Sequence, residues 1–473
     1  MRTFYIEQFG CRATQADGVA LERQLLQRGY TRGAKDAADI VVVNTCTVTA
    51  AADAQARDAI RKIGAKNRSA RVIVTGCYAQ RAPEELATLP GVAWVVGNSH
   101  KPELPEIIAS FFSTPSAAGF FPAASLRGTS TSAAQAPARI LTGDFERTPL
   151  SSAPVFGGER NRTRPTLKIQ DGCNSRCSYC VIPSVRGKSR SLPPEMVVRE
   201  IHQLTASGVR EIVLSGINIG TYGRDLHPPF TFQDLLRRVL GETPVQRLRV
   251  SSIEPMDVTK DLIEFFAAND RLAQHFHMPL QSGTDRILAA MHRWYRAEHY
   301  ARRAHLIREK FPCAAIGADV IAGFPGESDD EHRSTIDFIE NLPLTYLHVF
   351  SFSSRPGTAA ARISNEVSPA VIKDRARELR ALGDRKSHIF RREQVGMTFR
   401  VLTLRSRRDE YSPGEETATG SQTLARRSEY TPALSTNYLR FRVPESWPAN
   451  QWLNVRATVC EGAYLIGEPE LHA

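Results

Sequence analysis

Three cysteines stand close together in the segment DGCNSRCSYC, residues 171–180. Cys173, Cys177 and Cys180 give the spacing C-x3-C-x2-C, which differs from the four-cysteine run of ferredoxins and from zinc patterns built of paired C-x2-C units. Three thiolates can hold three irons of a cubane cluster and leave the fourth iron open, which suits electron delivery to a bound substrate. The spacing leaves open a purely structural cluster, or a zinc site completed by a distant histidine, His275 or His277.

A second set of cysteines, Cys11, Cys46 and Cys77, is spread through the first part of the chain. Each follows a short apolar run that reads as a strand: TFYIEQF, IVVVN and RVIVTG. Strands alternating with helices predict a parallel sheet, so all three thiols are expected at the carboxyl ends of strands, where open α/β sheets bind ligands. We expect a shared metal site; the alternative is three unrelated buried cysteines.

The composition is basic, with a net charge of +11 and a pI of about 9.4 over 473 residues. This excess suits a polyanionic partner such as nucleic acid, although a generally basic protein would look similar. The start MRTFYIEQFG has no apolar signal-like region, and no apolar run reaches the ~18 residues of a membrane span. We therefore expect a cytoplasmic protein with no membrane partner, in which clustered cysteines are metal ligands or catalytic groups.

The elements that position these cysteines suggest an α/β fold with three domains. Residues 1–111 predict a parallel α/β domain with helices over 15–28 and 51–66. Residues 112–160, rich in Ser, Ala and Pro, predict a flexible linker. Residues 161–394 predict six βα units, a partial barrel with polar residues after the strands, and 371–393 within them predict a charged helix. Residues 395–473 predict a small all-β domain.

These motifs together resemble the radical S-adenosylmethionine (SAM) superfamily, and its methylthiotransferase branch in particular. The similarity rests on the cysteine triplet within RPTLKIQDGCNSRCSYCVIPSVRGKSRS and on VVNTCTVT, VTGCYAQ, SGINIGTYG, RVSSIEP, HMPLQSG, DVIAGFPGE and HVFSFSSRPGT. It is greatest to the MtaB-like tRNA methylthiotransferases, and the C-terminal β domain resembles a TRAM RNA-binding domain. The resemblance covers nearly the whole chain except the linker.

The resemblance implies two [4Fe–4S] clusters and SAM as cofactors. Cys173, Cys177 and Cys180 would hold the cluster that cleaves SAM to a 5′-deoxyadenosyl radical. Cys11, Cys46 and Cys77 would hold an auxiliary cluster whose open iron carries the sulfur to be inserted. Thr14, in the Cys11 loop, stands where the family usually has Asn. The expected partners are tRNA and a small redox donor protein of the flavodoxin or ferredoxin type.

The resemblance also assigns SAM contacts to residues near the strand ends. Tyr179 would lie near the adenine, with packing of the cluster loop as the alternative. Ser215 and Gly216 would meet the amino group, and Val320 to Gly323 would lie beside the adenine. Ser251, Glu254 and Gln281 would bond the ribose and carboxylate. Ordinary turn polarity is the alternative for these residues.

The acceptor is expected to be N6-threonylcarbamoyladenosine next to the tRNA anticodon, converted to its 2-methylthio form. No side chain is assigned as a general acid or base, because the cofactors carry the chemistry. Asp171 and Arg186 are expected to position substrate, with a phosphate contact as the alternative for Arg186. Phe352 and Arg355, with Phe350, are expected to stack on or clamp a base, with core packing as the alternative for the two Phe.

Three rival functions remain open from the sequence. The first changes only the acceptor, to N6-isopentenyladenosine or to a ribosomal-protein aspartate. The second is a non-catalytic RNA-binding protein with structural iron–sulfur clusters. The third is a simple radical SAM methylase, which needs no auxiliary cluster.

Overall fold

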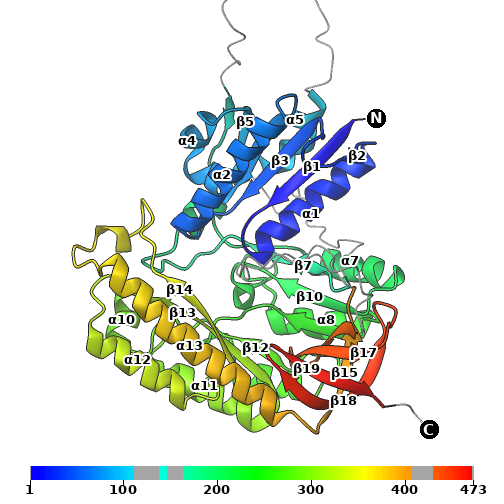
Figure 1. Ribbon diagram of the computed structural model, residues 1–473, viewed down its shortest axis with the longest axis vertical. Coiled ribbons are helices and arrows are strands. Elements are labelled where there is room, and N and C mark those ends of the chain that lie inside the picture. The colour runs from blue at the N-terminus through cyan, green and yellow to red at the C-terminus, as the bar shows by residue number, and fades with distance from the viewer. Residues whose placement is uncertain (1, 111–137, 146–162, 406–429, 471–473) are drawn as a thin grey trace, which may run out of the picture. The chain divides into compact units, whose positions relative to one another are not determined.

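The computed structural model describes residues 2–110, 138–145, 163–405 and 430–470 (Figure 1). The chain forms two compact units, each with its own set of contacts. The first unit comprises residues 1–157, 171–175 and 180–190, and the second comprises 158–170, 176–179 and 191–473. Cys173 and Cys180 thus belong to the first unit, and Cys177 belongs to the second.

The described part of the first unit is built on a sheet of six parallel strands in the order β2-β1-β3-β4-β5-β6. The strands are β1 (Thr3–Gln8), β2 (Thr31–Arg32), β3 (Ile40–Thr45), β4 (Arg71–Gly76), β5 (Val92–Gly97) and β6 (Arg139–Leu141). The helices are α1 (Arg12–Gln27), α2 (Ala50–Lys66), α3 (Cys77–Arg81), α4 (Pro83–Ala87), α5 (Leu104–Ser110) and α6 (Ile182–Arg186), with a 3-10 turn η1 (Asn98–Glu103). The parallel α/β domain predicted for the N-terminal region is therefore confirmed.

Side chains point alternately to the two faces of this sheet along its central strands, and helices cover both faces. Val41 and Val43 of β3 pack with Ile60 of α2 on one face. Ile40 and Val42 pack with Leu21 and Leu25 of α1 on the other. A strand that is buried on both faces needs apolar residues throughout, which explains the unbroken run IVVV in β3.

Strand β6 lies inside the segment that the sequence predicts as a linker. It pairs with β5 in parallel, with Val95 opposite Ile140, and ends the described sheet at that edge. The three-residue run Arg-Ile-Leu is too short to stand out as a strand among Ser, Ala and Pro residues. The remainder of the predicted linker, 112–137 and 146–160, lies outside the described residues.

The second unit contains two three-stranded parallel sheets that follow one another in chain order. They are β7-β10-β11 and β12-β13-β14, with β7 (Thr166–Lys168), β10 (Glu211–Ser215), β11 (Arg247–Val250), β12 (His275–His277), β13 (Ala315–Ala322) and β14 (Tyr346–Ser351). The isolated bridge Leu248↔Leu272 and the bond from the Ile253 amide to the His277 carbonyl (2.9 Å) connect β11 with β12. These strands match the six runs predicted for the partial barrel.

Helices follow the strands of the second unit and cover one side of each sheet. They are α7 (Pro194–Ala206), α8 (Phe232–Glu242), α9 (Lys260–Ala267), α10 (Asp285–Ala290), α11 (Ala297–Lys310), α12 (Asp329–Asn341) and α13 (Pro369–Glu393), with 3-10 turns η5 (Ile219–Thr221) and η6 (Ala360–Arg362). Short polar side chains start several of them: Thr231, Thr259, Ser328 and Ser368 each accept a first-turn amide. Such caps satisfy amides that have no partner within the helix.

A separate two-stranded sheet pairs β8 (Gln170–Asp171) with β9 (Arg190–Ser191).

The C-terminal region of the second unit forms a closed β-barrel in the order β15-β16-β17-β19-β18. Its strands are β15 (Thr398–Thr403), β16 (Tyr430–Ser435), β17 (Arg440–Pro444), β18 (Trp452–Glu461) and β19 (Tyr464–Pro469). This confirms the small all-β domain, and a closed barrel is consistent with a TRAM-like domain. The barrel is tied to β11 because Arg247 and Arg249 donate to carbonyl oxygens of Leu434 and Ser435, each at 3.0 Å.

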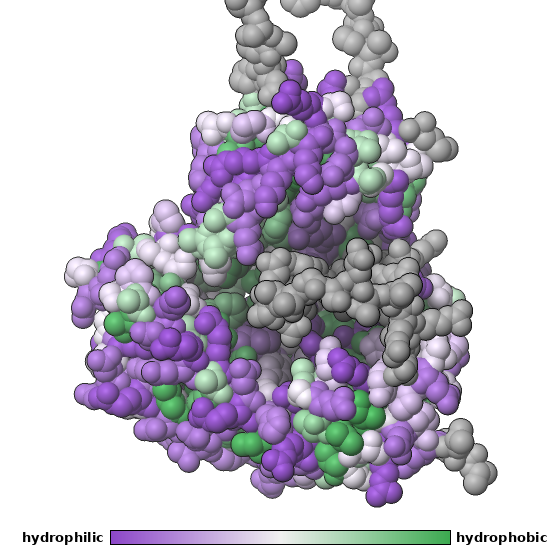
Figure 2. Space-filling view, in the orientation of Figure 1, coloured by the Kyte–Doolittle hydropathy of each residue, from purple (hydrophilic) through white to green (hydrophobic). Residues whose placement is uncertain are grey.

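The surface is mostly hydrophilic in the view of Figure 2, with hydrophobic residues in scattered patches. None of the helices in the described ranges combines the length and the apolar character that crossing a bilayer requires.

Candidate metal and cofactor sites

The first candidate site is formed by Cys11, Cys46 and Cys77 in the first unit. Cys11 precedes α1, Cys46 follows β3, and Cys77 opens α3 directly after β4. The strands β1, β3 and β4 are neighbours and parallel, so the three cysteines lie at one edge of the sheet, as predicted. None of the eight cysteines of the chain, all within the described residues, forms a disulfide.

Glycine brings two of these cysteine loops together. Gly10 has a φ of +101°, and a Cβ added there would lie 2.4 Å from Cys46 Cβ and 2.8 Å from Cys46 Sγ. Any side chain at this position would therefore collide with Cys46, so only glycine allows the Cys11 loop to approach so closely. Cys46 is 4 % exposed and Cys77 is 2 % exposed.

The chemistry of these thiols fits a bound metal. Burial, together with the nearby Cys11 and Cys77, raises the pKa of Cys46 to about 12, so this thiol stays protonated unless a cation binds. The Asn98 side-chain amide donates to Cys77 Sγ at 3.4 Å, and Cys11 Sγ lies 3.6 Å from Thr14 Oγ1. Such contacts from the surrounding shell orient metal-bound thiolates.

A buried ion network surrounds this site in the first unit. The guanidinium of Arg186, which is 1 % exposed, donates to Asp171 (2.8 Å), Asp17 (3.1 Å) and Thr14 (3.3 Å). Lys101 donates to Asp17 at 2.9 Å. Arg186 and Asp171, predicted to position substrate, thus bond to each other; sequence reasoning missed Asp17 and Lys101.

Cys173 and Cys180 of the triplet also belong to the first unit. The Cys173 amide donates to the Gly187 carbonyl at 3.0 Å, and the Ser175 amide donates to Cys173 Sγ at 3.4 Å. Gly172 has a φ of +71°, and a Cβ there would lie 2.1 Å from the Lys188 carbonyl oxygen. Cys180 precedes Val181, which packs with Val185 against Cys77. An amide that donates to sulfur stabilises a thiolate, which a cluster ligand must be.

Cys177 belongs to the second unit, where Arg293 bonds it. Arg293 Nη1 donates to Cys177 Sγ at 3.3 Å, and Nη2 donates to the carboxylate of Glu254. Burial raises the pKa of Glu254, and the Arg293 charge opposes that rise. Sequence reasoning predicted Glu254 but missed Arg293, because nothing in MHRWYRAEHY marks this arginine as a partner of a residue 39 positions away.

Of the predicted SAM-binding residues of the second unit, Ser215 ends β10, Gly216 follows it, and Ser251 and Glu254 follow β11. The Gln170 side-chain oxygen, which sequence reasoning missed, holds the loop after Ser215 and Gly216 by accepting the Ile217 and Asn218 amides at 2.8 Å each. The Ser251 amide donates to Leu214 O at 3.0 Å.

Gln281 and Gly323 lie after β12 and β13, and Val320 lies within β13. Gln281 has a φ of +68° and pairs with Val320 in an isolated bridge. The Gly323 amide donates to Glu327 at 2.9 Å.

The aromatic residues predicted near cofactor and substrate differ in exposure. Tyr179 and Phe352 are partly buried and pack against a core cluster that contains Ile321 and Phe324. Phe350 is 40 % exposed, whereas Arg355 is only 6 % exposed. Phe352 thus contacts the core in this structure, and Phe350 is the more exposed of the two phenylalanines.

His275 and His277, considered above as distant zinc ligands, bond to other groups of the second unit. His275 Nε2 lies 2.8 Å from Tyr346 Oη, and His277 contacts both Tyr346 (2.9 Å) and Asp319 (2.9 Å). These contacts give no support to a zinc site shared with the triplet.

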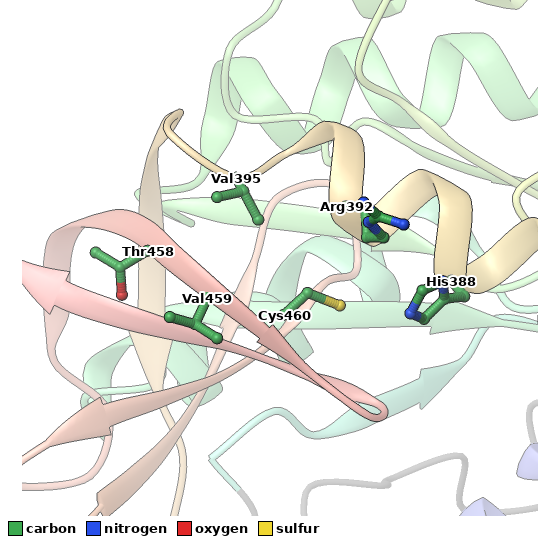
Figure 3. Close-up of a pocket in the computed structure, with 6 residues that line it drawn as sticks. All are labelled: His388, Arg392, Val395, Thr458, Val459 and Cys460. Carbon is green, nitrogen blue, oxygen red and sulfur yellow. The ribbon is translucent and has the colours of Figure 1, made fainter.

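A pocket of about 560 Å3 lies between the end of α13 and β18. Its lining residues are His388, Arg392, Val395, Thr458, Val459 and Cys460 (Figure 3). None of the residues predicted to bind metal, cofactor or substrate is among them, so this pocket is not the candidate site.

Comparison with known proteins identifies the family of the chain. Residues 3–97 match the model described as "Uncharacterized protein family UPF0004", and residues 167–339 match that of the Radical SAM superfamily. The chain is 34 % identical over 407 residues to the threonylcarbamoyladenosine tRNA methylthiotransferase MtaB of Aquifex aeolicus, covering 85 % of this chain and 93 % of that protein. The chain belongs to the radical SAM methylthiotransferase family. Its family implies SAM and a [4Fe–4S] cluster as cofactors.

Further methylthiotransferases are similar over much of their length. MtaB of Bacillus subtilis is 36 % identical over 389 residues, covering 81 % of each chain. The tRNA-2-methylthio-N(6)-dimethylallyladenosine synthase of Syntrophobacter fumaroxidans is 34 % identical over 371 residues, covering 77 % of each. The radical SAM methyltransferase TsrM of Kitasatospora setae has the same fold, with a TM-score of 0.53 at 18 % identity over 76 % of this chain and 77 % of that one. The MtaB proteins and the Syntrophobacter enzyme are thus all named for methylthiolation and differ in the adenosine they are named for.

Proposed function

We propose that this radical SAM methylthiotransferase acts on tRNA and places a methylthio group at C2 of N6-threonylcarbamoyladenosine beside the anticodon. One observation carries the proposal: the chain has two separate sets of three cysteines, each in loops that follow parallel strands. A methylase would need only the triplet. The second set supports an auxiliary [4Fe–4S] cluster, for which sulfur insertion provides the reason.

The cofactors supply a radical that breaks an unactivated C–H bond, together with sulfur and a methyl group. The protein has to hold these groups in place and keep their ligands ionised. Arg293 serves both purposes at the triplet, because it bonds Cys177 and orients the Glu254 carboxylate. Asn98 plays the corresponding part at Cys77.

The SAM contacts follow from the same family assignment. We assign Tyr179, Ser215, Gly216, Ser251, Glu254, Gln281, Val320 and Gly323 to SAM. The positive φ of Gln281 and its bridge to Val320 place these two together after β12 and within β13, which supports their joint assignment. Asp171, Arg186, Phe352 and Arg355 remain our assignments near the substrate, and the burial of Arg186 favours an indirect, positioning part for it.

The acceptor is inferred from the relatives. The match to this chain covers 93 % and 81 % of the length of the two MtaB proteins, and 77 % of the length of the dimethylallyladenosine enzyme. Isopentenyladenosine remains the second candidate, because that enzyme is also 34 % identical. We further infer a cytoplasmic location, where tRNA is modified, and a flavodoxin- or ferredoxin-like electron donor.

The test is a comparison of tRNA nucleosides by mass spectrometry. A bacterial strain that lacks its own methylthiotransferases would express the chain or its Cys177→Ala variant. We expect 2-methylthio-N6-threonylcarbamoyladenosine with the unaltered chain alone. Accumulation of 2-methylthio-N6-isopentenyladenosine instead would show that the second candidate is the acceptor. If neither nucleoside appears, both candidate acceptors are contradicted.

A further inference from the structure

A polar cluster lies on the sheet β12-β13-β14, on the face away from the helices. Phe276 of β12 points to the helical side, where it packs against Phe266 of α9 and Phe311. Side chains alternate along a strand, so His277 points to the opposite side. The register pairs His277 with Gly317 and Asp319 with His348, which brings three adjacent strands to one place.

The ligating atoms of this cluster are close enough to share one ion. Asp319 Oδ1 lies 2.9 Å from His277 Nε2 and 3.3 Å from His348 Nδ1, and all three atoms lie within 4.8 Å of one another. Neighbouring ligands at about 2.1 Å from an octahedral ion are about 3 Å apart. The separation of 2.9 Å matches this value, and the separation of 3.3 Å exceeds it slightly.

A second layer of contacts fixes the orientation of His277. Its Nδ1 lies 2.9 Å from Tyr346 Oη, which in turn lies 2.8 Å from His275 Nε2. The Tyr346 ring lies over Gly317, where an added Cβ would be 2.0 Å from the ring carbon Cζ. Metal-bound histidines characteristically donate their other ring nitrogen to such a partner, which leaves Nε2 as the ligand.

We propose that His277, Asp319 and His348 bind a divalent first-row transition-metal ion in addition to the iron–sulfur clusters. Two imidazoles and one carboxylate, with the remaining positions open, form the ligand set known from mononuclear iron(II) sites; imidazole also suits zinc, and a carboxylate with open positions for oxygen ligands suits manganese. The side chains become more exposed from His277 (7 %) through Asp319 (24 %) to His348 (57 %). An ion can therefore enter from the His348 side, and an oxygen ligand can reach its open positions from there.

The competing explanation is that the three side chains form only a hydrogen-bonded network, in which the two histidines donate to Asp319.

Manganese binding separates the two explanations. The probe is Mn2+ added to the anaerobically reconstituted full chain, whose oxidised [4Fe–4S] clusters give no EPR signal. Free Mn2+ is measured from its six-line EPR signal, and bound Mn2+ is examined for coupling to imidazole nitrogen. We expect about one bound Mn2+ per chain with nitrogen coupling, and at least a tenfold weaker affinity in His348→Ala.

Further variants keep the test independent of folding and of the proposed function. His348 is exposed, so its removal leaves the core intact, and Tyr346→Phe should weaken binding about tenfold by loosening His277. His305→Ala, at an exposed histidine outside the cluster, should bind as the unaltered chain does. Equal binding by the unaltered chain and His348→Ala, or bound Mn2+ without nitrogen coupling, would overturn the metal site. The readout uses neither SAM nor tRNA, so either result leaves the methylthiotransferase assignment untouched.

Discussion

Arg186 Nη2 lies 3.1 Å from Asp17 Oδ2, although 169 positions separate the two residues. The same guanidinium bonds Asp171 at 2.8 Å, just before the cysteine triplet. Arg186 thereby connects α1, which follows Cys11, with the segment that carries Cys173. One buried cation therefore joins the helix after Cys11 to the segment before Cys173.

We predict that Arg186→Met destabilises the first unit by about 3–5 kcal/mol, because it removes the guanidinium that bonds the buried Asp171 carboxylate and leaves Asp17 with Lys101 alone. Denaturant unfolding of the anaerobic holoprotein measures the loss. Arg68→Met, at an exposed position of the same unit, is the control and should change stability by less than about 0.5 kcal/mol. If Arg186 instead contacts an RNA phosphate, the variant would bind tRNA more weakly while keeping its stability.

The two cysteine sets should be separable by iron analysis. Unaltered protein reconstituted without oxygen should contain about eight irons and eight sulfides per chain, from two cubane clusters. Replacing Cys11, Cys46 and Cys77 together by Ala should leave about four of each, and the same change at Cys173, Cys177 and Cys180 should also leave about four. About four irons in the unaltered protein would instead favour the simple methylase.

Local sequence pattern was sufficient for most of the fold. The run IVVVN predicts a strand of a parallel sheet, and β3 is such a strand, with Val41 and Val42 packed on its opposite sides. The placement of Cys11, Cys46 and Cys77 also followed from the sequence, since it needs only the order of strands and turns. Strand β6 could not be predicted, because Ile140 and Leu141 form a strand by pairing with the neighbouring β5 and their own sequence has no strand pattern.

Contacts that depend on register could not be predicted. Asp319 contacts His277, which lies 42 positions earlier in the chain, and His348, which lies on the next strand. Both contacts are set by the alignment of β12, β13 and β14. Arg293 reaches Cys177 over 116 positions through the packing of the segment after α10. A sequence gives the residue types at these sites but not the three-dimensional alignment that makes them neighbours.

Arg293→Met should make the potential of the SAM-associated cluster more negative. The arginine places a positive charge and an N–H donor on Cys177 Sγ at 3.3 Å, and both stabilise the reduced, more negative cluster. The expected change is about 60 mV, equivalent to about 1.4 kcal/mol for a one-electron couple. A potentiometric titration followed by EPR measures it. Arg293→Lys keeps the charge and should change the potential less; an unchanged potential in Arg293→Met would mean that Cys177 is not a cluster ligand or that this contact is absent in solution.

Glu211→Gln should destabilise the second unit in a pH-dependent manner. Glu211 is fully buried, and its carboxylate bonds Arg247 (2.7 Å), Arg249 (2.8 Å) and Arg164 (3.2 Å). Burial opposes its ionisation, but the charges of Arg249, Arg247 and Arg164 outweigh burial and lower the pKa below the ordinary value of 4.5. Because the pKa is lowered on folding, this stabilisation is complete above about pH 4.5 and is lost as the pH falls towards the folded-state value.

The difference in unfolding free energy between unaltered protein and Glu211→Gln should therefore be about 3–5 kcal/mol at pH 7 and shrink below pH 4.5. Comparing the two proteins at the same pH removes the acid effects that they share. Glu242→Gln, which affects an exposed pair with Arg238 on α8, should cost less than about 0.5 kcal/mol at any pH. A difference that stays constant from pH 7 to pH 3.5 would show that Glu211 acts through its shape and hydrogen bonds, and that its charge is not what holds Arg247 and Arg249 against the β-barrel.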